Sequence, residues 1–208
     1  MILSLLLLLA TAPHSGDPVA ASLESFSRVA SYTVTIRSKG DDSSQIIRYF
    51  YKRPGFVRME FVSPHNGAVL VYSPLTEKAR LRPFGFFKSM VLTLDPGSSL
   101  IRGPQGRRVD RSDLGALLET VKTLAEKGKT GVKGNVKVGG KDTVLVEVTG
   151  SNGETVAGGV HRYLIWLDAV TILPLKVRSF DQKDSLIEDV AMDDLEIDVT
   201  LPDSLFEI

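Results

Sequence analysis

Apolar and polar residues alternate along two stretches of the chain, and turns divide each stretch into short segments. The strand-like segments of the first stretch are Tyr32–Arg37, Gln45–Lys52, Phe56–Val62, Ala68–Tyr72 and Lys78–Arg82. Those of the second stretch are Lys133–Val138, Thr143–Thr149, His161–Asp168, Leu173–Phe180 and Leu186–Asp198. Alternation places two sets of side chains on shared faces: Ile47, Tyr49 and Tyr51, and Val57, Met59 and Phe61. Short strands joined by short turns predict an antiparallel meander of about ten strands, and argue against a parallel nucleotide-binding sheet.

Two further segments have helical periodicity. Asp17-Pro18 opens the first, because aspartate is a favourable N-cap and proline is tolerated at the first helical position. Its apolar stripe consists of Val19, Leu23, Phe26 and Ala30, and the helix is expected to end near Ala30. The second helix is expected to have Ser112 as its N-cap and to end at Lys127-Gly128. Its apolar stripe consists of Leu114, Leu117, Leu118, Val121, Leu124 and Ala125.

Residues 83–111 interrupt the rhythm of strands with repeated proline and glycine. Connections of this length are uncommon in a compact domain and are often lids or binding loops. The segment begins with residues that are too apolar for a solvated loop: Phe84, Phe86, Phe87, Met90, Val91 and Leu92. We expect them to cover a hydrophobic surface or to be covered. These elements together predict an α+β fold in which one highly curved antiparallel sheet wraps the helices.

Composition narrows the classes of function. The chain has 208 residues, which suggests a single domain, and 43% of them are hydrophobic, which excludes a disordered protein. Lysine plus arginine number 25 and aspartate plus glutamate number 25, and a zero balance argues against nucleic acid as the main partner. The sequence has no cysteine, which excludes disulfides, thiolate metal sites, cysteine nucleophiles and a lipid-modified cysteine.

The N-terminus resembles a secretory signal. Ile2–Ala10 is almost wholly apolar but shorter than the ~20 residues that span a bilayer, and Ala10-Thr11-Ala12 fits a cleavage site. No lysine or arginine precedes the run, so a buried N-terminal strand is the alternative. The prediction is a signal peptide at residues 1–12, then one domain at 13–208 with a lid insertion at about 83–131, exported in soluble form to the periplasm.

The sequence contains no pattern typical of an enzyme. His14, His65 and His161 stand in separate segments without metal-ligand spacing, and the common nucleophile, metalloprotease and nucleotide-binding motifs are absent. The acidic residues near the C-terminus are Asp189, Asp193, Asp194, Glu196 and Asp198. They lack the spacing of a calcium loop, which favours a solvated strand face with Leu195 and Ile197 pointing inward. We predict a non-enzymatic protein with no cofactor and no metal ion.

Several motifs resemble the outer-membrane lipoprotein carrier family, the LolA-like group. Lys52-Arg53-Pro54 precedes the hydrophobic strand Gly55–Phe61, and Tyr72-Ser73-Pro74 precedes an acidic residue and another strand. The matching C-terminal motifs are Trp166-Leu167-Asp168, Leu173–Val177, Leu195–Asp198 and Leu201–Phe206. The resemblance covers roughly residues 19–208, and the middle of the chain, from Phe84 to Gly131, resembles uncharacterised relatives more than the carrier itself.

The resemblance implies an unclosed β-barrel whose helices form a lid over an apolar cavity. It also implies a monomeric chaperone that shields lipoprotein acyl chains between an inner-membrane donor and an outer-membrane acceptor during outer-membrane biogenesis. Arg53 matches the arginine that hydrogen-bonds the lid and controls its opening in the carrier. The alternative for Arg53 is that it satisfies turn carbonyls or pairs with a carboxylate.

Two hypotheses for function remain open. A carrier of lipoproteins or other amphiphiles would have a ligand-binding cavity, and its expected apolar residues are Val57, Met59, Phe61, Val69, Val71, Phe84, Phe86, Phe87, Leu117 and Val121. An envelope sensor with the same fold would instead bind a protein partner through Phe84–Leu92. The basic cluster of Arg102, Arg107, Arg108 and Arg111 is either a solvated loop or a contact for lipid headgroups or an acidic partner.

Overall fold

A computed structural model describes residues 16–40, 43–85 and 89–208. The expected signal peptide at residues 1–12, and Phe86 and Phe87 of the expected cavity, lie outside the described residues. The helices are α1 (Pro18–Arg28) and α2 (Leu114–Glu126). The first strands are β1 (Ser31–Gly40), β2 (Ser44–Lys52), β3 (Phe56–Ser63), β4 (Val69–Ser73), β5 (Lys78–Arg82) and β6 (Leu92–Leu94). The later strands are β7 (Gly128–Val138), β8 (Lys141–Gly150), β9 (Arg162–Asp168), β10 (Pro174–Phe180) and β11 (Leu186–Ile197).

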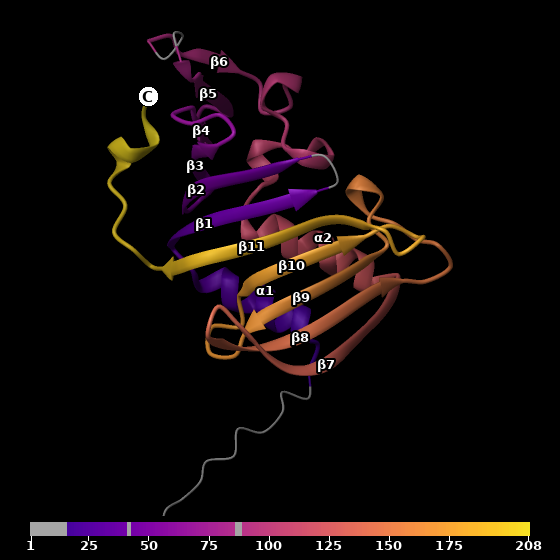
Figure 1. Cartoon of the computed structure of the whole chain (residues 1–208). Coiled ribbons are helices and arrows are strands. Elements are labelled where there is room, and N and C mark those ends of the chain that lie inside the picture. The colour runs from indigo at the N-terminus through magenta and orange to yellow at the C-terminus, as the bar shows by residue number, and fades with distance from the viewer. Residues whose placement is uncertain (1–15, 41–42, 86–88) are drawn as a thin grey trace, which may run out of the picture.

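The strands form one curved antiparallel sheet with two free edges (Figure 1). Within the described residues its eleven strands run in the order β6-β5-β4-β3-β2-β1-β11-β10-β9-β8-β7. Strand β1 lies at the centre and joins the early meander to the late one by pairing with both β2 and β11. The sheet does not close, because β6 and β7 pair with one neighbour each. The predicted α+β fold with an unclosed curved sheet is therefore confirmed.

Both helices lie on the concave face of the sheet and pack against each other (Figure 1). Asp17 caps α1 by accepting a hydrogen bond from the Val19 amide at 2.8 Å, as expected. Gly115 of α2 permits the close approach of the helices, because a Cβ there would lie 2.4 Å from Cε1 of Phe26. The predicted faces of β2 and β3 are also confirmed, since Tyr49 pairs with Met59 in the sheet register.

Three local predictions are wrong. Asp113, not Ser112, caps α2, because its carboxylate accepts hydrogen bonds from the amides of Gly115 and Ala116. Strand β7 begins five residues before Lys133, because pairing with β8 along its whole length outweighs the low strand propensity of its glycines and lysines. Ile197 is 38% exposed instead of buried, because the register of β11 shifts near Asp194, whose φ is 53°.

Strand β6 is an element that the sequence did not predict. Its three residues pair with β5 inside the segment expected to be a long loop. A three-residue strand flanked by proline and glycine leaves too short a pattern to recognise. Over the part of the chain that the structure describes, no helix has both the length and the apolar character needed to cross a membrane.

Replacing Leu118 tests the packing of α2 on the sheet. Leu118 is 1% exposed in the main hydrophobic core, so Leu118→Ala is expected to lower the free energy of unfolding by about 3 kcal/mol. Leu75→Ala is the matched control, because Leu75 is 79% exposed, and its effect is expected to stay within about 0.5 kcal/mol. Urea denaturation of both variants measures the difference, and equal stabilities would contradict the placement of α2.

Candidate ligand-binding site

Two adjoining cavities lie on the concave face, beneath the segment that connects β6 to α2. We call residues 99–112 the roof segment; it contains the 3₁₀ turns η2 (Ser99–Ile101), η3 (Pro104–Gly106) and η4 (Val109–Arg111). The first cavity has a volume of about 410 Å³ and the second about 380 Å³. Both volumes fall within the range of roughly 300–1,000 Å³ that is usual for small-molecule sites.

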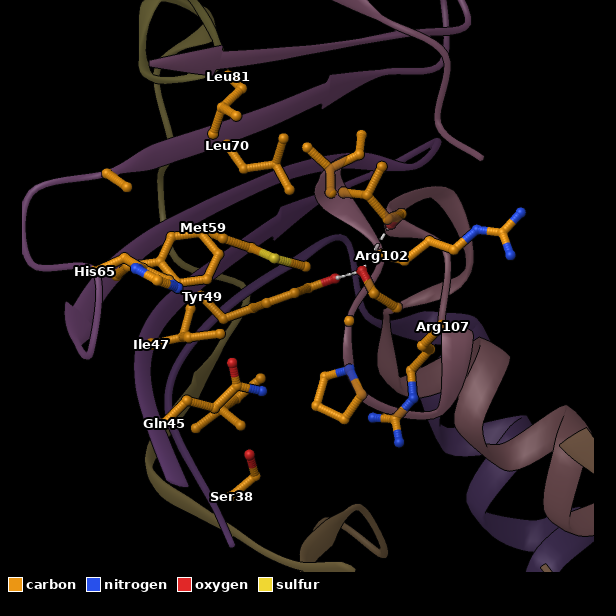
Figure 2. A pocket seen from close by; sticks show the side chains of 18 of the residues that line it. Ser38, Gln45, Ile47, Tyr49, Met59, His65, Leu70, Leu81, Arg102 and Arg107 are labelled. Atoms are coloured by element: carbon orange, nitrogen blue, oxygen red, sulfur yellow. Dashed lines mark hydrogen bonds between the residues drawn. The ribbon is translucent and has the colours of Figure 1, made fainter. Parts of the chain in front are cut away.

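The first cavity lies between the early strands and the roof segment. Ile47, Met59, Leu70 and Leu81 project into it from the successive strands β2, β3, β4 and β5 (Figure 2). The register pairs Met59 with Leu70 and Leu70 with Leu81, so these side chains form one continuous apolar floor. Leu100, Ile101, Pro104 and Val109 of the roof segment form the opposite wall. His65 lies at the margin, where its ring stacks on Phe84 with centroids 5.0 Å apart.

The second cavity lies between α2 and the strands on the other side of β1. Its floor contains Val34 of β1, Val177 of β10 and Met192 of β11, and its wall contains Ala116 and Leu117 of α2. These residues face the helix because alternate residues of each strand point to the same side of the sheet. Ser179 of β10 and Glu188 of β11 also line this cavity and add polar groups to it.

Three buried tyrosines hold the roof segment and α2 against the sheet. Tyr32 stacks between Tyr49 and Tyr51, with ring centroids 5.8 and 5.1 Å away. The Tyr32 hydroxyl accepts a hydrogen bond from the Leu114 amide at 3.1 Å, at the start of α2. The hydroxyls of Tyr49 and Ser112 lie 3.0 Å apart, and Ser112 donates to the Val109 carbonyl at 2.7 Å (Figure 2). These bonds fix the end of the roof segment over the wall between the cavities.

An ion pair attaches the middle of the roof segment to the sheet. The guanidinium of Arg107 lies 2.7 Å from Oε2 of Glu188 in β11, and the side chain of Glu188 is only 5% exposed. Both residues line both cavities. Glu188 shares its face with Val190 and Met192, so a carboxylate interrupts an otherwise apolar row. The alternation of Glu188 with Val190 and Met192 is visible in the sequence and indicates an inward-facing carboxylate. Glu188 was not identified from the sequence, because acidic residues are common in this strand and were expected to face solvent.

Arg53 holds the C-terminus of α1. Its guanidinium donates hydrogen bonds to the carbonyls of Val29 at 2.7 Å, Phe26 at 3.0 Å and Ser27 at 2.6 Å. These carbonyls lie at the end of α1, where the last carbonyls of a helix lack partners and favour a cation. Arg53 therefore satisfies carbonyls at the end of α1, which packs on α2.

The structure brings some of the expected site residues together and separates others. Met59, Phe61 and Phe84 line the first cavity, and Leu117 lines the second. Val57 and Val121 line neither cavity; they are 2% and 0% exposed in the core. Their positions between sheet and helices leave no space beside them for a ligand.

Val69 and Val71 face away from both cavities. They pack with Phe206 in a separate cluster on the convex face of the sheet, where residues near the C-terminus cover them. Alternation along β4 turns Leu70 to the concave face and therefore sends its two neighbours to the other side. The sequence did not reveal this, because every residue from Ala68 to Tyr72 is apolar or aromatic and the run has no visible alternation.

The acidic cluster near the C-terminus is engaged with basic side chains. Asp189 lies 2.6 Å from Arg178 and 3.2 Å from Lys176, and Asp193 lies 2.7 Å from Arg37. Within the described ranges, no group of three histidine or carboxylate side chains is arranged to hold a metal ion. The basic cluster also forms ion pairs: Arg108 pairs with Asp110 at 2.8 Å. This contact lowers the pKa of Asp110.

Comparison with known proteins places this arrangement in a family. The family model described as MucB/RseB N-terminal domain matches residues 89–207, more than half of the chain. A search of curated proteins by sequence found no match. The fold expected from the resemblance, a curved unclosed sheet over helices, is shared with solved structures of low sequence identity.

Three solved structures share the fold at low identity. An uncharacterized conserved protein from Thermus thermophilus is 9% identical, with a TM-score of 0.58 over 92% of this chain and 91% of that one. The lipoprotein LppX of Mycobacterium tuberculosis is 10% identical, with a TM-score of 0.54 over 89% and 96%. The MucA/MucB complex of Pseudomonas aeruginosa gives 18% identity and a TM-score of 0.52 over 92% of this chain. This chain spans only 60% of that matched chain.

The tyrosines of the site predict an alkaline limit to stability. Burial raises the pKa of all five tyrosines and raises that of Tyr163, in the second cavity, to about 12. Unfolded tyrosine titrates near pH ~10. Above that pH the unfolded chain loses protons that the folded chain keeps, so the free energy of unfolding should fall as pH rises toward about 12. Urea denaturation from about pH 9 upward measures the slope.

Tyr163→Phe isolates one contribution to this loss. Phenylalanine has no ionisable group. Over the same pH range, the free energy of unfolding of the variant should therefore fall by on the order of 2 kcal/mol less than that of the parent protein. The same alkaline slope in both proteins would show that the Tyr163 hydroxyl is not shielded from water.

Proposed function

We propose that this chain, which belongs to the MucB/RseB N-terminal domain family, binds hydrocarbon chains of lipids or lipoproteins in the two cavities of its concave face. The observation that carries the proposal is the continuous apolar floor of the first cavity, formed by one side chain from each of four successive strands. Burial of each methylene group contributes ~0.8 kcal/mol, so such a floor binds an acyl chain without directional chemistry.

Carriage of an amphiphile through the periplasm follows from this binding. The cavity would shield hydrocarbon from water, and donor and acceptor proteins at the two membranes would load and unload it. We propose residues 1–12 as the export signal and residues 13–208 as a single, monomeric binding domain with a lid insertion at about 83–131. No catalytic residue is assigned, because transport of this kind requires binding and release only.

Recognition of a protein partner is the second candidate. MucB has been solved in complex with MucA, and the family match extends that possibility to this chain. A specific observation favours it: Phe84, which lines the first cavity, is 49% exposed, and Met90 and Val91 of the same segment are 50% and 39% exposed. Exposed apolar residues in such a group are typical of a docking surface.

A charge in the first cavity tests the lipid-binding proposal. Leu70→Glu would place a carboxylate on the apolar floor, and burial of a charge without a partner is costly. Among the described residues that line this cavity, the arginines all belong to the roof segment and not to the floor. Displacement of a fluorescent fatty acid from the purified protein measures affinity. We expect Leu70→Glu to weaken fatty-acid binding at least about tenfold, since even a modest cost of about 1.4 kcal/mol has this effect.

Val62→Glu is the matched control for this experiment. Val62 is 39% exposed and lines neither cavity. Its affinity should equal that of the parent protein. Equal affinities of all three proteins would overturn the cavity as the binding site, and capture of one folded partner by a protein that binds no fatty acid would favour the second candidate.

Arg53→Gln tests control of the lid. Loss of the guanidinium removes three hydrogen bonds to the end of α1 and should lower the free energy of unfolding by about 1–2 kcal/mol. If α1 restrains the lid, fatty acid should also dissociate several-fold faster in stopped-flow displacement. Arg48→Gln, at an exposed position of β2, is the control. Lower stability with an unchanged dissociation rate would assign Arg53 a structural role only.

A further inference from the structure

The concave floor has a polar end that spans both cavities. In the sheet register Tyr163 of β9 pairs with Ser179 of β10, and Ser179 pairs with Glu188 of β11; all three line the second cavity. Ser38 of β1 pairs with Gln45 of β2, and both line the first cavity. In Figure 2, Ser38, Gln45 and Arg107 lie toward one end of the first cavity, while Leu70 and Leu81 lie toward the other. We call Ser38, Gln45, Tyr163, Ser179 and Glu188 the polar rim.

Two hydroxyl groups of the polar rim are available to a ligand. Tyr163 and Ser179 are 6% and 5% exposed, and neither hydroxyl makes a hydrogen bond to another residue in the described part of the chain. Burial raises the pKa of Tyr163 to about 12, so its hydroxyl stays protonated and can donate. Neither hydroxyl is among the fully buried side-chain atoms that lack a partner, so both are accessible from the second cavity that they line. A ligand that brings acceptor oxygens to this end of the cavity can therefore accept hydrogen bonds from them.

The cavity linings carry an excess of positive charge. Arg107 pairs with Glu188 and Arg108 pairs with Asp110. Arg102 and Arg111 also line the cavities, and within residues 16–40, 43–85 and 89–208 neither forms an ion pair with a carboxylate. Arg102 instead donates to the Gly97 carbonyl at 3.0 Å. The described residues that line the two cavities include four arginines and two carboxylates, Glu188 and Asp113. This excess of two positive charges suits an anionic group.

The two cavities diverge from a shared wall. The residues that line both of them are Ile36, Arg107, Arg108, Ser112, Glu188 and Val190. From this wall the first cavity extends over β2 to β5, and the second extends over β9 to β11 under α2. The arrangement therefore has two apolar arms, a polar rim that touches both, and cationic side chains beside them.

We propose that the two cavities together bind one anionic phospholipid with two acyl chains, an inference that rests on the proposed lipid-binding function. One chain occupies each arm, and the ester carbonyls lie at the polar rim, where Tyr163 and Ser179 donate hydrogen bonds. The phosphate lies near Arg102 and Arg111. A single-chain amphiphile fills one arm only, and a zwitterionic headgroup offsets its phosphate with its own cation.

Short-chain lipids that dissolve as monomers test this ligand class. Titration calorimetry of the full chain with dioctanoyl phosphatidylglycerol, octanoyl lysophosphatidylglycerol and dioctanoyl phosphatidylcholine compares chain number and charge separately. The two-chain anionic lipid should bind at least about tenfold more tightly than its single-chain counterpart, because part of the gain from burying the second chain is lost in ordering it. It should also bind several-fold more tightly than phosphatidylcholine, and added salt should reduce that preference.

Variants of each arm and of the arginines assign the parts of the site. Leu81→Trp narrows the first arm and Ala116→Trp narrows the second, so either should remove the advantage of two chains while single-chain binding persists. Val170→Trp, at a position 90% exposed, is their control. Arg102→Gln with Arg111→Gln should remove the preference for phosphatidylglycerol over phosphatidylcholine, whereas Arg48→Gln should not.

The outcomes separate this inference from the function beneath it. Equal affinities for one-chain and two-chain lipids, or for the anionic and zwitterionic lipids, would overturn the inference while leaving lipid binding in place. Binding of none of the three lipids, together with no binding of fatty acid, would overturn the proposed function itself.

Discussion

The sheet is wider than the two short helices that pack on its concave face. Eleven strands about 4.8 Å apart span roughly 48 Å, whereas the 13 residues of α2 extend only about 20 Å. α1 and α2 pack together and fill the region under the centre and the late strands. Over the early strands the cover is the roof segment, which is made of 3₁₀ turns and leaves cavities beneath it.

Several polar contacts attach this cover to the sheet. Tyr32 and Tyr49 hold the start of α2 and the end of the roof segment, and the ion pair of Arg107 with Glu188 holds its middle. Arg53 holds α1 from the turn after β2. Apolar contacts hold the cover as well, since Ile101 and Val109 of the roof segment and Leu118 of α2 are buried in the main hydrophobic core. The roof segment contributes fewer buried apolar residues than α2, and the cavities lie beneath it.

Sequence patterns predicted the fold well and the site only in part. Alternation in β2 and β3 was clear enough to place Tyr49 and Met59 on one face, and an aspartate-proline pair marked the start of α1. In β4 every residue is apolar or aromatic up to Tyr72, so nothing in the sequence distinguished Leu70, which lines the cavity, from Val69 and Val71, which do not. The pairing of Arg107 with Glu188 joins residues 81 positions apart, and only the folded sheet brings them together.

Identification of the molecule that accompanies the protein from its own host is the most direct test of hydrocarbon binding. Native mass spectrometry of the freshly purified chain, followed by lipid analysis of the released material, measures both occupancy and chemistry. We predict an acylated molecule bound at close to one per chain, removed on treatment with an apolar competitor. A protein recovered without bound lipid, and unable to take up lipid when it is supplied, would contradict the claim that its concave face is a binding site for hydrocarbon.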